Sequence, residues 1–256
     1  MIKINWGRSL NNFGDCLQPY IVKHYGLTPV FCSWGKSDLI IVGSILQWIP
    51  PSFHGYIVGA GGDDIKYSFP NAKVLAVRGK LTKSNFDNNS QIILGDPGIL
   101  MPLVFSEKVD VKYEIGIIPH FVDEDSVKMR EIKSRFVGEN VLFINVLRNP
   151  KIVISEIKQC KCIVSSSLHG LIIADAFGIP NKRIVDRETM PTAFYDYKFH
   201  DYYSSIDYTE QPIELSGDET IEFFKNNVSL KPQDKIKDLQ DNLNEMMLKV
   251  TSEFKR

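Results

Sequence analysis

One segment of the chain reads as a complete strand–turn–helix unit, which directs the fold to the α/β class. Residues 162–180 have the sequence CIVSSSLHGLIIADAFGIP. Ile163 and Val164 suit a buried strand, and three serines follow them. Apolar residues then recur at helical spacing until Gly178, where a helix can end, and Pro180 blocks its continuation. The segment predicts a buried strand that leads through a tight serine turn into a short helix.

The turn of this unit is a candidate anion site. A helix N-terminus presents backbone N–H groups that bind anions, although Ser165, Ser166 and Ser167 can cap these groups with their hydroxyls. His169 falls in the first helical turn and adds a titratable group beside a bound anion. The alternative is a histidine on an ordinary surface turn, and the rest of the chain has to decide between the two.

The same rhythm of short apolar runs and polar ends fills the chain. In the first half the runs are 39–42, 56–58, 74–77 and 92–94, and in the second half they lie within 114–118, 141–146, 161–166 and 183–185. Runs that are apolar throughout indicate a parallel sheet covered on both faces. We therefore predict two doubly wound domains, 1–110 and 111–232, that face each other across a cleft, followed by an amphipathic helix within 233–256.

The N-terminal segment is predicted in more detail. A strand at 2–6 is followed by a loop at 7–15 and a helix at 16–25. Asp15 is the expected N-cap of this helix, and Gly26 is its expected end.

Composition excludes several classes of function. The chain has 256 residues, and 30 Lys and Arg against 31 Asp and Glu give a net charge of −1, so nothing favours a nucleic-acid partner. The most apolar stretch, 39–60, is interrupted by prolines and glycines and is no membrane span. Without a charged-then-apolar leader, and with four cysteines read as reduced packing residues, the expected location is the cytoplasm. The chain carries no phosphate-loop or dinucleotide fingerprint, and the acidic pair Asp63–Asp64 is too weak a signal to predict a metal.

The candidate site residues share one position, just after a predicted strand. Ligands of parallel sheets bind at the carboxyl ends of the strands. The residues are Asn12, Gly14, Asp15, Arg78, Asp96, His120, Ser166, Ser167 and His169, together with Lys198, His200, Asp201, Tyr203 and Ser204 in the polar and aromatic run 195–205.

Several of these residues have a purely structural alternative. Asp15 can serve only as a helix cap, and Asp96 begins the turn signature Asp-Pro-Gly. His120 can be structural, and the aromatic residues of 195–205 can serve only in packing. Arg78 follows a strand directly, so we expect it to face the cleft and bind an anion rather than to be a solvated surface residue.

The order of the motifs resembles the polysaccharide pyruvyltransferase family. NNFGDCLQPYIV, LAVRGKLT, LGDPGIL, IGIIPHFVD, VSSSLHGLIIADAFGIP and KFHDYYSS occur in the order typical of that family, between about residues 5 and 206. The resemblance implies a GT-B-like fold of two Rossmann-like domains. It also implies transfer of a pyruvyl group from phosphoenolpyruvate to two hydroxyls of a sugar, with formation of a cyclic ketal and release of phosphate.

The resemblance assigns expected roles to the candidate residues. His169 is the expected acid/base, and the expected donor-binding residues are Arg78, Ser166, Ser167, Leu168, Gly170 and Lys198. The expected acceptor or cleft residues are Asn12, Gly14, Asp15, Asp96, His120, Asp201, Tyr203 and Ser204. Ser167 stands where many members carry arginine, so other cations have to hold the donor. Aromatic residues such as Trp48, Phe121, Tyr195 and Tyr197 are candidate stacking surfaces for a sugar ring.

The implied partners are phosphoenolpyruvate and a glycan or lipid-linked oligosaccharide, with no redox cofactor or metal. Such an acceptor allows peripheral contact at the inner membrane face. Two alternatives remain open: a glycosyltransferase of the same fold that uses a sugar nucleotide, and a non-catalytic glycan-binding relative, which the Ser167 departure supports.

Overall fold

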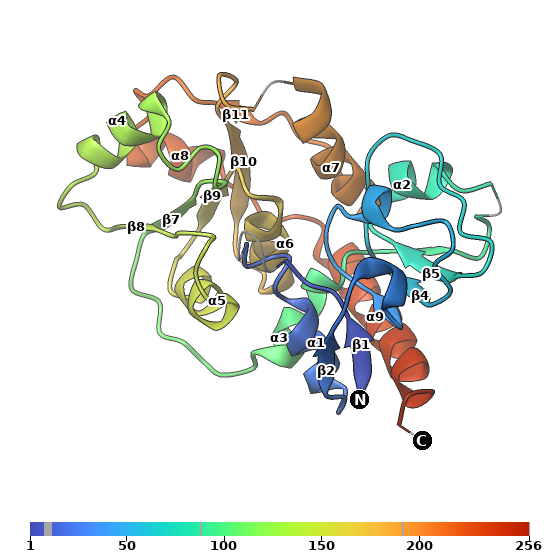
Figure 1. Cartoon of the computed structure of the whole chain (residues 1–256). Coiled ribbons are helices and arrows are strands. Elements are labelled where there is room, and N and C mark those ends of the chain that lie inside the picture. The colour runs from blue at the N-terminus through green and yellow to red at the C-terminus, as the bar shows by residue number, and fades with distance from the viewer. Residues whose placement is uncertain (8–11, 88, 191, 256) are drawn as a thin grey trace.

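Two parallel sheets lie side by side in the computed structural model, which describes residues 1–7, 12–87, 89–190 and 192–255 (Figure 1). The first sheet is six-stranded, in the order β2-β1-β3-β4-β5-β6. Its strands are β1 (Ile2–Ile4), β2 (Pro29–Phe31), β3 (Leu39–Ile40), β4 (Tyr56–Val58), β5 (Lys73–Val77) and β6 (Ile93–Leu94). The predicted loop at 7–15 includes residues 8–11, which lie outside the described residues.

The second sheet is five-stranded, in the order β11-β10-β9-β7-β8. Its strands are β7 (Ile115–Ile118), β8 (Val141–Phe143), β9 (Ile163–Ser165), β10 (Asn181–Val185) and β11 (Ile213–Glu214). Every pair of neighbouring strands in both sheets is parallel. The prediction of an α/β fold with parallel sheets is therefore confirmed, whereas β2 and β11 had no clear signal in the sequence.

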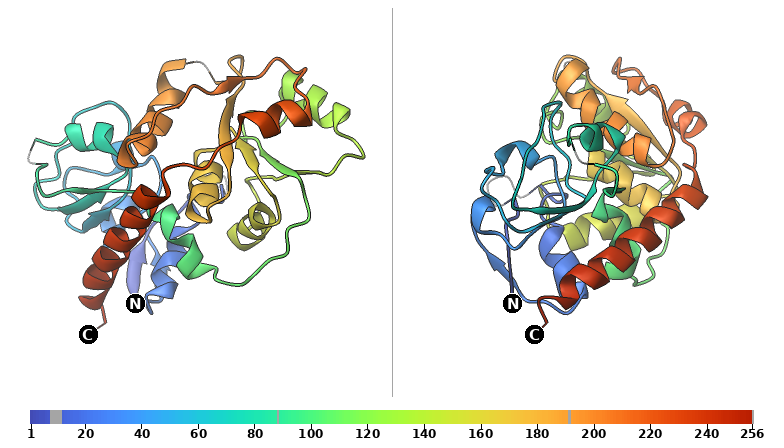
Figure 2. Two further views of the ribbon diagram at one scale, coloured as in Figure 1. Left: turned by 180° about the vertical axis from the view of Figure 1, so that it is seen from behind. Right: turned by 90° about the vertical axis from the view of Figure 1, so that its right-hand side faces the viewer.

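Helices follow most strands and pack on the sheets (Figure 2). They are α1 (Gln18–His24), α2 (Lys80–Ser84), α3 (Met101–Val104), α4 (Val127–Arg135), α5 (Pro150–Lys158), α6 (Leu168–Ala176), α7 (Thr192–Ser205), α8 (Ile221–Asn227) and α9 (Gln233–Ser252). Helix α1 ends as predicted, with Gly26 at a φ of 81°. Its predicted N-cap is wrong: the cap position is Leu17, because residues 13–16 form turns before the helix begins.

The unit of 162–180 has the predicted form, with one correction. Strand β9 leads into α6, and Gly178 follows the helix with a φ of 65°. The predicted serine cap is absent, because Ser167 at the N-cap makes no side-chain bond to the helix. The hydroxyl of Ser165 instead accepts a bond from the N–H of Ser167, 3.0 Å away. The first turn of α6 is thus not capped by the serine hydroxyls.

Two elements of the second half return to the first sheet. Helix α7 caps α2, since Ser204 Oγ accepts from the N–H of Lys80 at 2.8 Å and Asp201 Oδ1 accepts from the N–H of Thr82 at 2.8 Å. The apolar face of helix α9 packs on η3 (Pro97–Leu100) and β4. Helix α9 ends close to the N-terminus, so the two termini lie together in every view (Figures 1 and 2). The largest apolar core contains residues of both halves, such as Ile4 and Leu171. The two sheets are therefore fixed to each other beneath the site.

Candidate functional site

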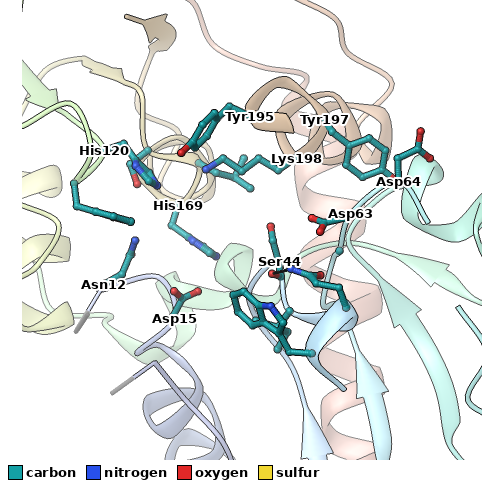
Figure 3. Close-up of a pocket in the computed structure, with 17 residues that line it drawn as sticks. Asn12, Asp15, Ser44, Asp63, Asp64, His120, His169, Tyr195, Tyr197 and Lys198 are labelled. Atoms are coloured by element: carbon teal, nitrogen blue, oxygen red, sulfur yellow. Dashed lines mark hydrogen bonds between the residues drawn. The ribbon is translucent and has the colours of Figure 1, made fainter. Parts of the chain in front are cut away.

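A cavity of about 580 Å³ lies between the two sheets, at the carboxyl ends of their strands (Figure 3). The first half lines it with residues that follow β1, β3 and β4: Asn12, Asp15, Ser44, Ile45, Gln47, Trp48, Gly62, Asp63 and Asp64. The second half lines it with residues that follow β7 and β9 and with helix α7: His120, Phe121, Ser167, Leu168, His169, Tyr195, Tyr197 and Lys198. Both halves thus contribute to one site, at the sheet edge where the sequence predicts it.

His169 is held in the first turn of α6 with its ring nearly buried. The imidazole packs directly on the backbone of Gly14, where an added Cβ would lie 2.1 Å from Nδ1 of His169. Its Nε2 lies 3.7 Å from Oδ2 of Asp96, and neither of these two atoms has a hydrogen-bond partner. The other oxygen of Asp96 accepts from the N–H of Gly98 at 2.9 Å, which fixes the carboxylate. Gly14 and Asp96 therefore position the imidazole and do not line the cavity themselves.

Lys198 of α7 brings a positive charge into the cavity (Figure 3). Its Nζ has no carboxylate within ion-pair distance in the described part of the chain, and it lies over the rings of Tyr195 and Phe199 at 5.3 and 5.4 Å. Burial, and then the charge of Arg78, lowers the pKa of Lys198 to about 8. The ammonium group is thus available to bind an anionic ligand.

His120 is a neutral hydrogen-bonding group. Burial, and then the charge of Lys198, lowers the pKa of His120 to about 3. Its Nδ1 accepts from the N–H of Val122 at 3.4 Å, an arrangement that leaves the proton of the neutral ring on Nε2. Ser166 lies one layer behind the cavity, where its hydroxyl accepts from the N–H of His120 at 2.8 Å and donates to Asp123.

Asp15 faces the cavity from the loop after β1 (Figure 3). Burial raises the pKa of its carboxyl, and the nearby His169 and Lys198 oppose that rise. Asn12 is fixed beside it, because Asn12 Oδ1 accepts from the N–H of Gly14 at 3.1 Å. A carboxylate and an amide thus face α6 and Lys198 across the cavity.

Arg78 lies in the wall behind the cavity and is not among the described residues that line it. Its side chain is 0% exposed, and its Nε donates to Oδ2 of Asp201 at 2.9 Å. Its Nη1 donates to Ser44 Oγ at 2.6 Å, and its Nη2 has no partner. The expectation that Arg78 faces the cleft is corrected here, because Asp201 of α7 covers the guanidinium. Arg78 and Asp201 form this ion pair where the two halves of the chain pack together.

The remaining predicted residues lie outside the cavity. Tyr203 is buried and its hydroxyl donates to Glu210 at 2.5 Å, and Ser204 caps α2. Gly170 packs against Ser165, where an added Cβ would lie 2.5 Å from the hydroxyl oxygen. No sequence motif selects Ser44 or Gln47, which line the cavity, although Gly43 after an apolar run marks their loop as the end of a strand.

The family model for polysaccharide pyruvyl transferase matches residues 3–181. The match covers β1 through the start of β10, and it includes the loop of Asp15 and the first turn of α6. The chain belongs to this family. The matched range contains several of the sequence motifs whose residues line the cavity.

Two relatives among the curated proteins match different shares of the chain. The chain is 37% identical over 135 residues to the uncharacterized protein L143 of Acanthamoeba polyphaga mimivirus, which covers 50% of the chain and 46% of L143. It is 26% identical over 215 residues to the succinoglycan biosynthesis protein ExoV of Rhizobium meliloti (strain 1021), which covers 81% of the chain and 65% of ExoV. The chain therefore spans about half of L143 and somewhat less than two thirds of ExoV. No solved structure matches the chain.

The described residues contain neither a metal-binding cluster nor a membrane-spanning helix. Within them, no group of three or more His, Cys, Asp or Glu side chains is placed to hold a metal ion. In the same ranges, no helix is both long and apolar enough to cross a membrane.

Proposed function

We propose that the chain transfers the pyruvyl group of phosphoenolpyruvate to two hydroxyls of a sugar in a polysaccharide or lipid-linked repeat unit. The product is a cyclic ketal, and phosphate is released. The observation that carries the proposal is that His169, Lys198 and the N-terminus of α6 meet in one cavity of a chain from this family. These are the groups that an anionic donor and a proton transfer require.

The donor is held by α6 and Lys198. Phosphoenolpyruvate carries a phosphate and a carboxylate, which match the N–H groups at the helix N-terminus and a nearby ammonium group. Ser167 stands where many family members have arginine, and Lys198 provides a cation in the same cavity. Arg78 is paired with Asp201 and does not line the cavity, so the proposal assigns it no contact with the donor.

His169 moves the protons of the reaction. The methylene carbon of phosphoenolpyruvate accepts a proton and becomes the methyl group, and the oxygen of a sugar hydroxyl bonds to the carbon that carries the phosphate. That hydroxyl loses its proton as it attacks. The carbon–oxygen bond to phosphate then breaks, and the second hydroxyl bonds to the same carbon and loses its proton in turn. The imidazole serves as acid in the first step and as base toward the attacking hydroxyls.

The acceptor hydroxyls are bound opposite α6. Asn12, Asp15 and Ser44 line that side, and the neutral His120 offers its Nε2–H. Their amide, carboxylate and hydroxyl groups match the donors and acceptors of a sugar. The cytoplasm, or the inner membrane face, stays the predicted location for an enzyme with such an acceptor.

Two measurements test the proposal. Phosphate release from phosphoenolpyruvate should require a glycan acceptor, and phosphoenolpyruvate should raise the melting temperature well beyond inorganic phosphate. A rise in melting temperature only with UDP- or GDP-sugars would replace the proposal with a glycosyltransferase. Glycan binding without phosphate release from any acceptor would leave a non-catalytic relative.

A further inference from the structure

A second hollow opens beside the cavity, and we call it the tryptophan groove. It has a volume of about 390 Å³, and its lining includes Trp6, Trp34 and Trp48, which are all three tryptophans of the chain. Phe31 adds a fourth ring, with 40% of its surface exposed, and Trp48 is 61% exposed. Indole rings are costly to leave in water, and their gathering in one hollow is typical of a binding surface.

The groove also holds hydrogen-bonding groups that suit hydroxyls. Gln18 lines it with only 1% of its surface exposed, and its Nε2 donates to the carbonyl of Val42 at 3.2 Å. Oε1 of Gln18 has no donor, although a buried polar atom without a partner is unfavourable. Asn5 lies in the same lining, where its Nδ2 donates to the carbonyl of Cys32 at 2.7 Å.

The groove is continuous with the candidate active site. Asn12, Asp15, Ile45 and Trp48 line both hollows, so a ligand bound near His169 can extend directly into the groove. The described lining contains one carboxylate, that of Asp15, and no lysine or arginine. The carboxylate disfavours a second anionic ligand, and the amides of Asn5, Asn12 and Gln18 suit the hydroxyls of a neutral sugar.

We propose that the tryptophan groove binds the sugar units that flank the acceptor unit in a neutral glycan. The inference rests on the proposed function, because it takes the reacting sugar to lie beside His169. The apolar C–H faces of the flanking sugars stack on the indole rings, and their hydroxyls bond to Gln18 and Asn5. The enzyme thereby recognises a segment of chain and not a single sugar.

Tryptophan fluorescence reports directly on the groove, since all three tryptophans lie in it. The experiment titrates gluco-, galacto- and manno-oligosaccharides, from monosaccharides to hexasaccharides, into the full chain and follows the emission. It also measures phosphate release from phosphoenolpyruvate with the same acceptors. We expect emission changes, and a fall in the acceptor KM, that grow from mono- to oligosaccharides in at least one series.

Three variants locate the effect. Trp34 lines the groove and not the cavity. Trp34→Ala should raise the oligosaccharide KM by about tenfold without changing the KM for phosphoenolpyruvate, and Trp34→Phe should restore most of the loss. Phe223, an aromatic residue of α8 that is 44% exposed and lines neither hollow, provides the control Phe223→Ala, which should behave as the unaltered chain.

The outcomes separate the two proposals. Phosphate release that is equally efficient with mono- and hexasaccharides, or that is unaffected by Trp34→Ala, overturns the groove and leaves the proposed function standing. Length-dependent emission without phosphate release overturns the proposed function and supports a glycan-binding groove. No emission change with any oligosaccharide overturns the groove.

Discussion

Nε2 of His169 lies 3.7 Å from Oδ2 of Asp96, and neither atom has a hydrogen-bond partner. Asp96 is fully buried, and its second oxygen is fixed by the N–H of Gly98. The carboxylate on one side and the backbone of Gly14 on the other limit the orientations that the imidazole can take. The imidazole is therefore held in one place beside the cavity, as an acid/base group requires.

The first prediction concerns His169 itself. His169→Ala should lower kcat by about 10²- to 10⁴-fold, the usual contribution of a general acid/base. Phosphate release under saturating donor and acceptor is the measurement. His200→Ala, which removes an exposed histidine of α7 that does not line the cavity, is the matched control and should keep full turnover. Near-normal turnover of His169→Ala would exclude the acid/base role.

The second prediction concerns the contact between Gly14 and the imidazole. An added Cβ at Gly14 would lie 2.1 Å from Nδ1 of His169, so Gly14→Ala must displace the ring. A displacement of this size should cost about 10²-fold in turnover. The test is a double-mutant cycle with His169→Ala. Because both changes remove the same function, the double variant should be little worse than His169→Ala. Fully additive losses would show that Gly14 acts elsewhere.

The sequence predicts the place of the site in the fold more reliably than it predicts the contacts of individual residues. Apolar runs set strands such as β4 and β9, and polar residues after them point to the sheet edge where the cavity lies. The run 195–205 was expected to line the cleft as a polar cluster. It is a helix, so only one of its faces, with Lys198, reaches the cavity. Which face points inward depends on how α7 packs on α2, and no local pattern in the sequence encodes that packing.

Arg78 shows the same limit at a single residue. Its position after β5 was predicted correctly, but its partner Asp201 lies 123 residues away in the sequence. The pairing depends on the way the two halves dock. The sequence of either half, taken alone, does not show that Asp201 covers the guanidinium of Arg78.

The third prediction concerns this buried ion pair. Both side chains of Arg78 and Asp201 are 0% exposed, so Arg78→Ala leaves a buried carboxylate without its cation. Such a loss costs about 3–5 kcal/mol in the free energy of unfolding. Urea denaturation is the measurement. Arg78→Met combined with Asp201→Asn should recover a large part of the loss, because the pair then leaves no buried charge and the amide oxygen can still accept from the N–H of Thr82.

The same two helices offer a matched control. Lys80 of α2 and Asp207, which follows α7, form an ion pair in which both side chains are more than half exposed. Solvent screens such a pair, so Lys80→Ala should leave the urea midpoint almost unchanged. If Arg78→Ala changed only the KM for phosphoenolpyruvate and not the urea midpoint, Arg78 would be a donor ligand and not a structural cation.

The last prediction concerns pH and Lys198. Burial lowers the pKa of Lys198 to about 8, so the side chain is charged below that pH and neutral above it. If its charge holds the anionic donor, kcat/KM for phosphoenolpyruvate falls as the pH rises through about 8, by about tenfold per pH unit, because kcat/KM reports the free enzyme.

Lys198→Arg separates charge from other causes of this fall. Arginine stays charged throughout the range, so the fall near pH 8 should disappear if the variant still binds the donor. Lys198→Met should lower kcat/KM at pH 7 to a value that no longer changes through pH 8. A fall near pH 8 that persists in Lys198→Met would assign the titration to another group and remove Lys198 from donor binding.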